Sequence, residues 1–194
     1  ERIGNPPIYT QYLTSLMILK RQEEFPHMDP IDMQVVKEGD SFSVGNTKLK
    51  TFPVTHSIPD AMGVSVETPN GNVVITGDIR LTHENEEVDA FERKAWEGVG
   101  KDNNLLMMAD STNADRDGFS SPESAVFEAL ERIIRDTSSR LIIGTFASQF
   151  DRLIHIIKMA EKYGKHIVPE GRSIKTHIDI ALHAKMLEVK PGVI

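Results

Sequence analysis

The sequence contains no cysteine, which excludes a disulfide framework and any zinc site built on thiolates. No signal peptide is visible in it, and no apolar run comes near the roughly 18 residues that a membrane-spanning helix needs. We therefore expect no membrane partner and a cytoplasmic location. Basic residues are in the minority, with 22 Lys and Arg against 29 Asp and Glu, so the composition indicates no general basic surface.

Several catalytic motifs are also missing. The sequence has no Walker loop, no G-x-S-x-G and no G-x-G-x-x-G. Seven histidines are present, but no two are spaced as H-x-H or as i and i+4. Those spacings place two imidazoles from one strand or helix on a metal ion. A metal site contained in one short motif is therefore excluded.

The order of expected elements changes along the chain. The 194 residues are enough for one complete core or for parts of two domains. The first part predicts a helix over 11–24, capped by Thr10, and antiparallel strands near 33–36, 41–44 and 48–54. A later helix is expected over 90–99. From residue 105 strands alternate with helices, which is typical of a parallel sheet. These strands are expected near 105–109, 140–146 and 166–168, and the helices near 121–135, 151–163 and 174–187.

A hairpin brings one histidine and one aspartate toward the same end of the first sheet. Asn70-Gly71 lies between strands expected at 63–68 and 73–76, and Asn-Gly favours a tight two-residue turn. His56 precedes the first strand and Asp78 follows the second, so the outer ends of the hairpin can meet. The spacing alone is equally compatible with His56 as a metal ligand and with His56 as an ordinary residue at the end of a strand. For Asp78 the spacing is likewise compatible with a metal ligand and with a turn aspartate whose side chain hydrogen-bonds to its own backbone.

A second polar pair follows a later strand. Asp110 and Ser111 come directly after the expected strand 105–109, at the end where open α/β sheets bind ligands. A helix-capping or Asx-turn role is equally compatible. Three other histidines lie within helical patterns, where surface or packing roles are expected: His155, His177 and His183.

Five short segments occur in a characteristic order: T-H-S-I-P-D (55–60), T-G-D (76–78), A-D-S-T-N (109–113), G-T-F-A-S (144–148) and G-R-S (171–173). With these segments, essentially the whole chain resembles the ribonuclease J family, nucleases of metallo-β-lactamase fold that carry a beta-CASP domain. The resemblance implies an α/β fold class. Residues 1–95 (α+β) would form the later part of the αββα sandwich, and residues 96–194 the first half of a parallel-sheet beta-CASP domain.

The resemblance also implies roles for four residues. In this family the T-H-S histidine binds one metal ion and the G-D aspartate bridges two, which implies His56 and Asp78 as metal ligands. Asp78 and Asp110 are implied as catalytic residues, and Ser111 as a contact to a substrate phosphate. The implied reaction is hydrolysis of RNA phosphodiesters, as a 5′-to-3′ exonuclease and endonuclease, by water activated by two Zn²⁺ or other divalent ions. The implied partner is single-stranded RNA.

The chain also departs from the family pattern. The H-x-H-x-D-H motif that supplies most metal ligands is absent, and we expect it to precede residue 1. The later beta-CASP motifs and the last metal-binding histidine are expected to follow residue 194. We therefore expect an internal fragment of a longer enzyme, inactive alone and binding metal weakly or not at all, because a zinc site normally has three or four protein ligands. Unpaired strands would favour self-association or contact with the missing segments.

Two other hypotheses remain. One is a hydrolase of the same fold that acts on a small thioester or lactam, against which the beta-CASP-like segments from Ala109 onward argue. The other is a non-catalytic RNA-binding or assembly module. Composition and spacing by themselves indicate neither the direction of hydrolysis nor a preference for RNA over DNA.

Overall fold

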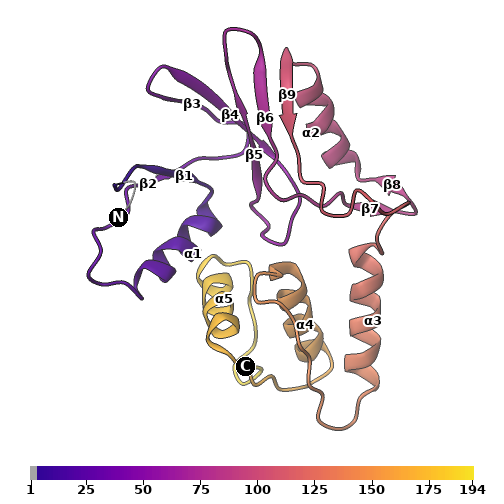
Figure 1. Cartoon of the computed structure of the whole chain (residues 1–194). Helices are drawn as coiled ribbons and strands as arrows, with labels where there is room; N and C mark the ends of the chain where they lie inside the picture. The colour runs from indigo at the N-terminus through magenta and orange to yellow at the C-terminus, as the bar shows by residue number, and fades with distance from the viewer. Residues whose placement is uncertain (1–3) are drawn as a thin grey trace. The chain divides into compact units, whose positions relative to one another are not determined.

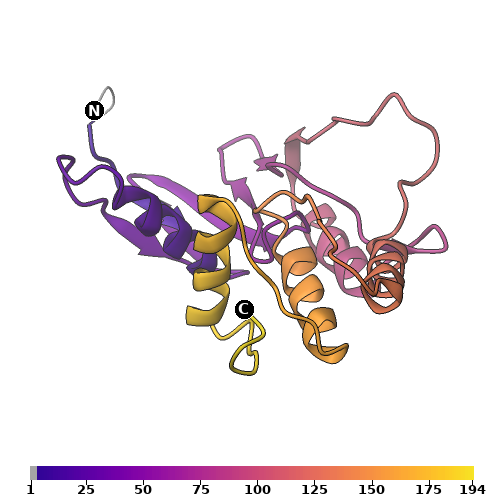
Figure 2. The same cartoon turned by 90° about the horizontal axis from the view of Figure 1, so that it is seen from below.

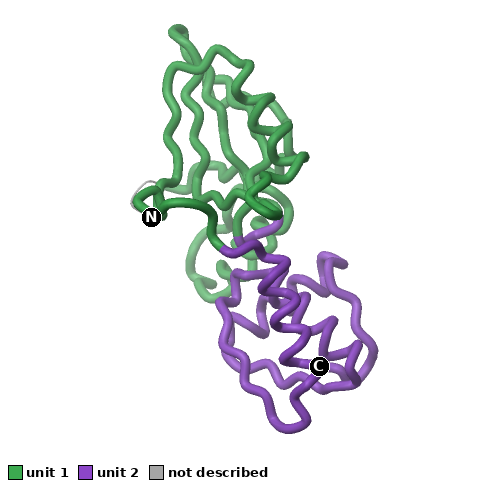
Figure 3. Tube along the Cα trace, turned by 90° about the vertical axis from the view of Figure 1, so that its right-hand side faces the viewer, with its two compact units in different colours: residues 1–56, 60–120 green, residues 57–59, 121–194 purple. Residues whose placement is uncertain are grey.

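The computed structural model describes residues 4–194, which divide into two compact units (Figure 3). Unit 1 runs to His56 and continues from Asp60 to Ser120. Unit 2 comprises Ser57–Pro59 and Ser121–Ile194. Within the described range, no helix is long and apolar enough to cross a membrane.

Unit 1 is built on a five-stranded sheet of order β3-β4-β5-β6-β9 (Figure 1). Neighbouring strands are antiparallel up to β6, and β9 is parallel to β6. Because β4 and β6 both run opposite to β5, the strands β4, β6 and β9 all end at the same edge. The hairpin predicted around Asn70-Gly71 is confirmed as β5 and β6. The predicted two-residue Asn-Gly turn is wrong, because the N–H of Gly71 donates to the carbonyl of Thr68 and so places Pro69 and Asn70 at the centre of the turn. The strands are β3 (Ser41–Val44), β4 (Thr47–Pro53), β5 (Met62–Val66), β6 (Asn72–Ile75) and β9 (Asn104–Met108).

Two short strand pairs flank this sheet. β1 (Ile8–Thr10) pairs in parallel with β2 (Met33–Val35), and α1 (Tyr12–Gln22) connects them. The sequence predicted β2 as part of an antiparallel run; this was wrong because the helical crossover returns the chain in the same direction. β7 (His83–Glu84) and β8 (Glu87–Val88) form a second hairpin, which the polar sequence did not predict.

Helix α2 (Ala90–Gly100) lies against one face of the sheet and confirms the helix predicted over 90–99. Phe52 and Val74 are buried there, and the ring of Trp96 meets Phe52 edge-on with centroids 5.5 Å apart. Gly63 lies beneath Phe52 on the neighbouring strand. A Cβ at that position would lie 2.2 Å from the ring, so the packing requires glycine.

The opposite sheet face, the open face, carries two rows of side chains across the strands, which are apolar except for the buried Thr51. One row is Leu49, Val66, Val73 and Leu106; the other is Thr51, Val64, Ile75 and Met108. β9 is an outer strand of the sheet as described, and Leu106 and Met108 are 51% and 54% exposed. The sequence predicted β9 as a buried strand, which is wrong for these residues because no further strand or helix covers them within the described range.

Unit 2 contains α3 (Glu123–Asp136), α4 (Phe150–Lys162) and α5 (Arg172–His183), close to the predicted helices. Its core gathers side chains from all three, with Ile134, Ile157 and Ile178 almost completely buried. The predicted strands 140–146 and 166–168 join no sheet among the described residues, since an extended segment needs a neighbour to form a ladder. The predicted parallel pairing of the later chain is seen only at β9, which joins the sheet of unit 1.

Candidate functional site

The predicted site residues follow three strands that end at one edge of the unit 1 sheet. His56 follows β4, Asp78 follows β6 and Asp110 follows β9. β5 lies between the first two strands but runs the other way, so its start rather than its end is at this edge. The sheet topology therefore places one imidazole and two carboxylates at the ends of parallel strands, where α/β sheets commonly bind ligands.

Hydrogen bonds tie the three segments beyond the strands to one another. The N–H of Arg80 donates to the carbonyl of Thr55 at 2.6 Å, which joins the segments after β6 and β4. The N–H of Ile79 donates to Oδ2 of Asp110 at 3.2 Å, and the N–H of Asp110 donates to Oγ1 of Thr76 at 3.2 Å. The segment that carries Asp78 is thus held between those that carry His56 and Asp110.

Hydrogen-bond donors around Asp110 stabilise the negative charge of its carboxylate. Oδ1 accepts the hydroxyl of Thr112 at 2.6 Å and its N–H at 2.9 Å. These bonds from Thr112, the N–H of Ile79 and the electrostatic influence of His56 hold the pKa of Asp110 below its usual value, with the Thr112 hydroxyl the largest cause. His56 and Asp110 are therefore close enough to interact electrostatically.

Asp78 lies on the turn that follows β6. Gly77 has φ of +64°, a left-handed conformation that glycine adopts readily and that turns the chain sharply after Thr76. Asp78 is exposed, next to the residue whose N–H contacts Asp110. The turn leaves its carboxylate accessible at the edge of the sheet.

Ser111 begins a long loop beside a hollow of about 650 Å³. The hollow lies between residues 79–83 and the loop 110–120, and both belong to unit 1. Ser111 is exposed, and its carbonyl accepts the N–H of Ala114 in a turn. Arg80 and Arg116 also line the hollow, which gives it cationic as well as hydroxyl groups.

The turn that carries His56 is fixed by a residue to which the sequence assigned no role. Oδ2 of Asp60 accepts the N–H of Leu13 at 2.6 Å, and Oδ1 accepts the hydroxyl of Thr14 at 2.9 Å. Helix α1 has no capping side chain at Gln11, so Asp60 rather than the predicted Thr10 satisfies its first turn. Thr76 and Thr112 were also missed. Only Thr112 had a recognisable signal, since a threonine two residues after an aspartate is a known turn pattern.

The donor types fit a divalent metal, but the described residues do not complete a site. Imidazole nitrogen and carboxylate oxygen are ordinary ligands of zinc. Between residues 4 and 194, however, no group of three or more His, Cys, Asp or Glu side chains is placed to hold a metal ion. His56, Asp78 and Asp110 can therefore supply at most part of a ligand set.

Comparisons with known proteins agree with the fold. Residues 2–144 match the metallo-beta-lactamase superfamily, and residues 138–194 match the family described as ribonuclease J, beta-CASP domain. A crystal structure of a protein of unknown function from Enterococcus faecalis V583 aligns over 95% of this chain and 45% of that one, with a TM-score of 0.69 and 22% identity. That likeness supports the fold.

Curated relatives narrow the family. The chain is 36% identical to ribonuclease J of Thermus thermophilus over 188 residues, which cover 95% of this chain and 32% of that protein. It is 32% identical to ribonuclease J of Sinorhizobium meliloti, covering 96% of this chain and 33% of the relative. The chain thus spans about a third of the length of these relatives. The predicted fold class, a metallo-β-lactamase part followed by part of a beta-CASP domain, is confirmed. The chain belongs to the metallo-β-lactamase superfamily and, within it, to the ribonuclease J family.

Proposed function

We propose that this chain is part of a metal-dependent ribonuclease and that His56 and Asp78 are two of its metal ligands. The observation that carries the proposal is the convergence of His56, Asp78 and Asp110 at one edge of the sheet, in a chain of the ribonuclease J family. Two Zn²⁺ or other divalent ions would supply an activated water there. Asp110 and Asp78 would act as the catalytic carboxylates. The division between the two family domains, 1–95 and 96–194, stays a prediction.

The substrate we propose is single-stranded RNA, cut as a 5′-to-3′ exonuclease and endonuclease. Support comes from the similarity to two ribonuclease J proteins and from the hollow next to Asp110. Ser111 would donate its hydroxyl to a backbone phosphate, and Arg80 and Arg116 place positive charge in the same hollow. Backbone contacts of this kind are usual for single strands. A cytoplasmic location is part of the same proposal.

We further propose that the chain alone is inactive and binds zinc weakly or not at all. Its ligand set is partial, and the remaining ligands would come from other parts of a longer protein. The open face and the outer strand β9 expose apolar side chains and unpaired backbone groups. Association with a second copy, or with the remaining parts of such a protein, would cover them.

Zinc titration by calorimetry at neutral pH tests the partial site. We expect only weak binding, with a dissociation constant above about 1 μM, the range of incomplete ligand sets. His56→Ala and Asp78→Asn should each remove the remaining heat of zinc binding. His27→Ala, in the turn region after α1, should leave this heat unchanged. Submicromolar binding by the unsubstituted chain would contradict the proposal, and so would equal effects of all three substitutions.

A non-catalytic RNA-binding or assembly module is the second candidate, and the incomplete ligand set favours it for the chain alone. Fluorescence anisotropy with a labelled single-stranded oligoribonucleotide separates the two. A module binds RNA without divalent ions and without dependence on Asp78. For the enzyme fragment, binding depends on the site carboxylates. The small-substrate hydrolase finds no support beyond the shared superfamily.

A further inference from the structure

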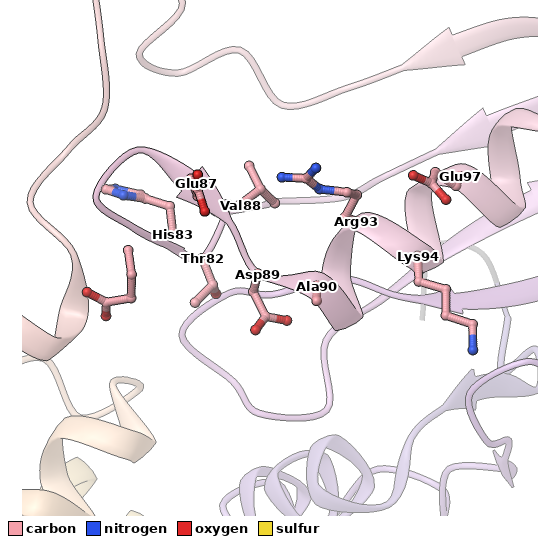
Figure 4. A pocket seen from close by; sticks show the side chains of 10 residues that line it. Thr82, His83, Glu87, Val88, Asp89, Ala90, Arg93, Lys94 and Glu97 are labelled. Atoms are coloured by element: carbon pink, nitrogen blue, oxygen red, sulfur yellow. The ribbon is translucent and has the colours of Figure 1, made fainter.

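His83 is a buried histidine that the proposed chemistry does not use. It begins the β7–β8 hairpin and is only 6% exposed. Figure 4 shows it at one end of the row of residues that line a hollow of about 500 Å³ along the start of α2. A buried imidazole so close to a polar surface needs a partner, because an unsatisfied buried polar group is costly.

The partner is the backbone of a distant loop. Nε2 of His83 lies 2.8 Å from the carbonyl oxygen of Ser120, and its ring packs on Phe119 with centroids 4.6 Å apart. Because the carbonyl can only accept, Nε2 carries the proton. Nδ1 is buried and has no hydrogen-bond partner in the described range. His83 is therefore held to the loop by one donated hydrogen bond and one ring contact.

The hairpin behind His83 is itself anchored. The carboxylate of Glu92, 4% exposed on α2, accepts the N–H of Thr82 at 2.7 Å. The N–H of Asp89 donates to the carbonyl of Thr82 at 2.9 Å. Helix α2 in turn packs on the sheet through Trp96. A fixed chain of contacts thus runs from the core of unit 1 to His83.

The loop that His83 contacts carries two of the proposed site residues. It begins at Asp110 and Ser111 and reaches Ser120 without helix or strand, and Figure 2 shows it arching away from the end of β9. Its first end is fixed by the bonds of Asp110 to Thr76 and Ile79. Between these ends every residue from 111 to 120 is exposed. Its far end is fixed at Ser120.

We propose that His83 is a positioning residue, whose Nε2–H bond to the Ser120 carbonyl closes the loop 110–120 and so holds Asp110 and Ser111 at the edge of the sheet. The closure of the loop matters for catalysis only through the proposed function, on which this part of the inference rests. The closure itself can be tested without metal or RNA. A failure of the zinc titration above would therefore leave this test intact.

Limited proteolysis of the whole chain tests the closure. Trypsin cleavage after Arg116, in the middle of the loop, is compared with cleavage after Arg93 on α2 in the same sample. The variants are His83→Leu, His83→Asn and His83→Gln. The amide nitrogen of Gln can occupy the place of Nε2 and donate to Ser120, whereas the shorter Asn corresponds to Nδ1 and cannot reach it.

We expect His83→Leu and His83→Asn to raise the ratio of Arg116 to Arg93 cleavage about tenfold, because proteolysis follows the population of the locally open loop. His83→Gln should restore the ratio to within about twofold, since it keeps the donated bond. His166→Gln is the matched control: His166 also contacts a backbone carbonyl, that of Gly192, but in unit 2. Unchanged ratios for the Leu and Asn variants would overturn the proposal, as would equal ratios for Asn and Gln or a tenfold rise in the His166 control.

Discussion

The carboxylate of Asp60 caps helix α1 from 47 residues away, because its Oδ2 accepts the N–H of Leu13 at 2.6 Å. Its Oδ1 accepts the hydroxyl of Thr14 at 2.9 Å. The contact satisfies part of the first turn of α1, and it also anchors the turn that begins at His56. Helix stability and the position of a proposed metal ligand are therefore connected through one carboxylate.

Removing this carboxylate should weaken α1. We expect Asp60→Ala to lower the free energy of unfolding by about 1–2 kcal/mol, the usual cost of a lost N-terminal cap, and Asp60→Asn to cost less because an acceptor remains. Urea denaturation measures the loss, and hydrogen exchange at Leu13 and Thr14 localises it. Asp40→Ala is the control, since Asp40 also accepts a backbone N–H, that of Lys37 at 2.7 Å, but in an exposed turn. An equal loss in both variants would contradict the capping role.

Gly63 should tolerate no side chain. A Cβ there would lie 2.2 Å from the ring of Phe52, so we expect Gly63→Ala to destabilise unit 1 by about 1–3 kcal/mol, as overpacking does. Gly98→Ala on α2 is the matched comparison. A Cβ at Gly98 meets nothing within 4 Å, so this change should stabilise the helix by up to about 1 kcal/mol. Thermal unfolding of both variants checks the opposite signs.

Local sequence patterns predict several elements of this fold. Asn70-Gly71 predicts the position of the β5–β6 hairpin, although its turn type differs from the expected one, since only Gly71 of this pair has positive φ. Apolar periodicity predicts α2, α3, α4 and α5 close to their observed bounds. The hairpin then brings His56 and Asp78 to one edge of the sheet, as the sequence indicated. Short-range geometry fixes these features.

Long-range contacts could not be predicted in the same way. Nothing local identifies Asp60 as the cap of a helix 47 residues earlier, or Ser120 as the partner of His83. The parallel pairing of β9 with β6 was missed because a strand pattern does not name its neighbour. The sequence therefore predicts the approach of His56 and Asp78, which one hairpin connects. It does not predict contacts between residues that only the complete fold brings together.

The stability of unit 2 should depend on pH through Glu131. Its carboxylate accepts Nζ of Lys162 at 2.6 Å and the hydroxyl of Tyr163 at 2.7 Å. These bonds, with Lys162 the largest cause, lower the pKa of Glu131 from its ordinary value of 4.5. A lowered carboxyl pKa stabilises the fold above the unfolded-state pKa, and that stabilisation disappears as the pH falls through the folded-state pKa.

Glu131→Gln should therefore destabilise the chain at pH 7 and lose its effect in acid. The difference in unfolding free energy between the two proteins should shrink below pH 4.5, the ordinary value for this carboxyl. Urea denaturation over a pH series measures it. Glu128→Gln on the same helix is the control, and its exposed side chain should give little difference at any pH. A Glu131→Gln effect that stays constant from pH 7 to pH 3 would contradict the assignment.

The open face should make the chain associate with itself. Ile75, Leu106 and Met108 lie on it and are 39%, 51% and 54% exposed, and β9 has one unpaired edge among the described residues. Lysines on an outer strand oppose edge-to-edge pairing, so we expect Leu106→Lys with Met108→Lys to shift the chain toward monomer. Sedimentation velocity over a concentration series measures the shift. Phe91→Lys removes an apolar side chain that is even more exposed, at 63%, from α2, and it should leave association unchanged. A monomeric unsubstituted chain at every concentration would show that the open face does not associate, and an equal effect of Phe91→Lys would place the contact elsewhere.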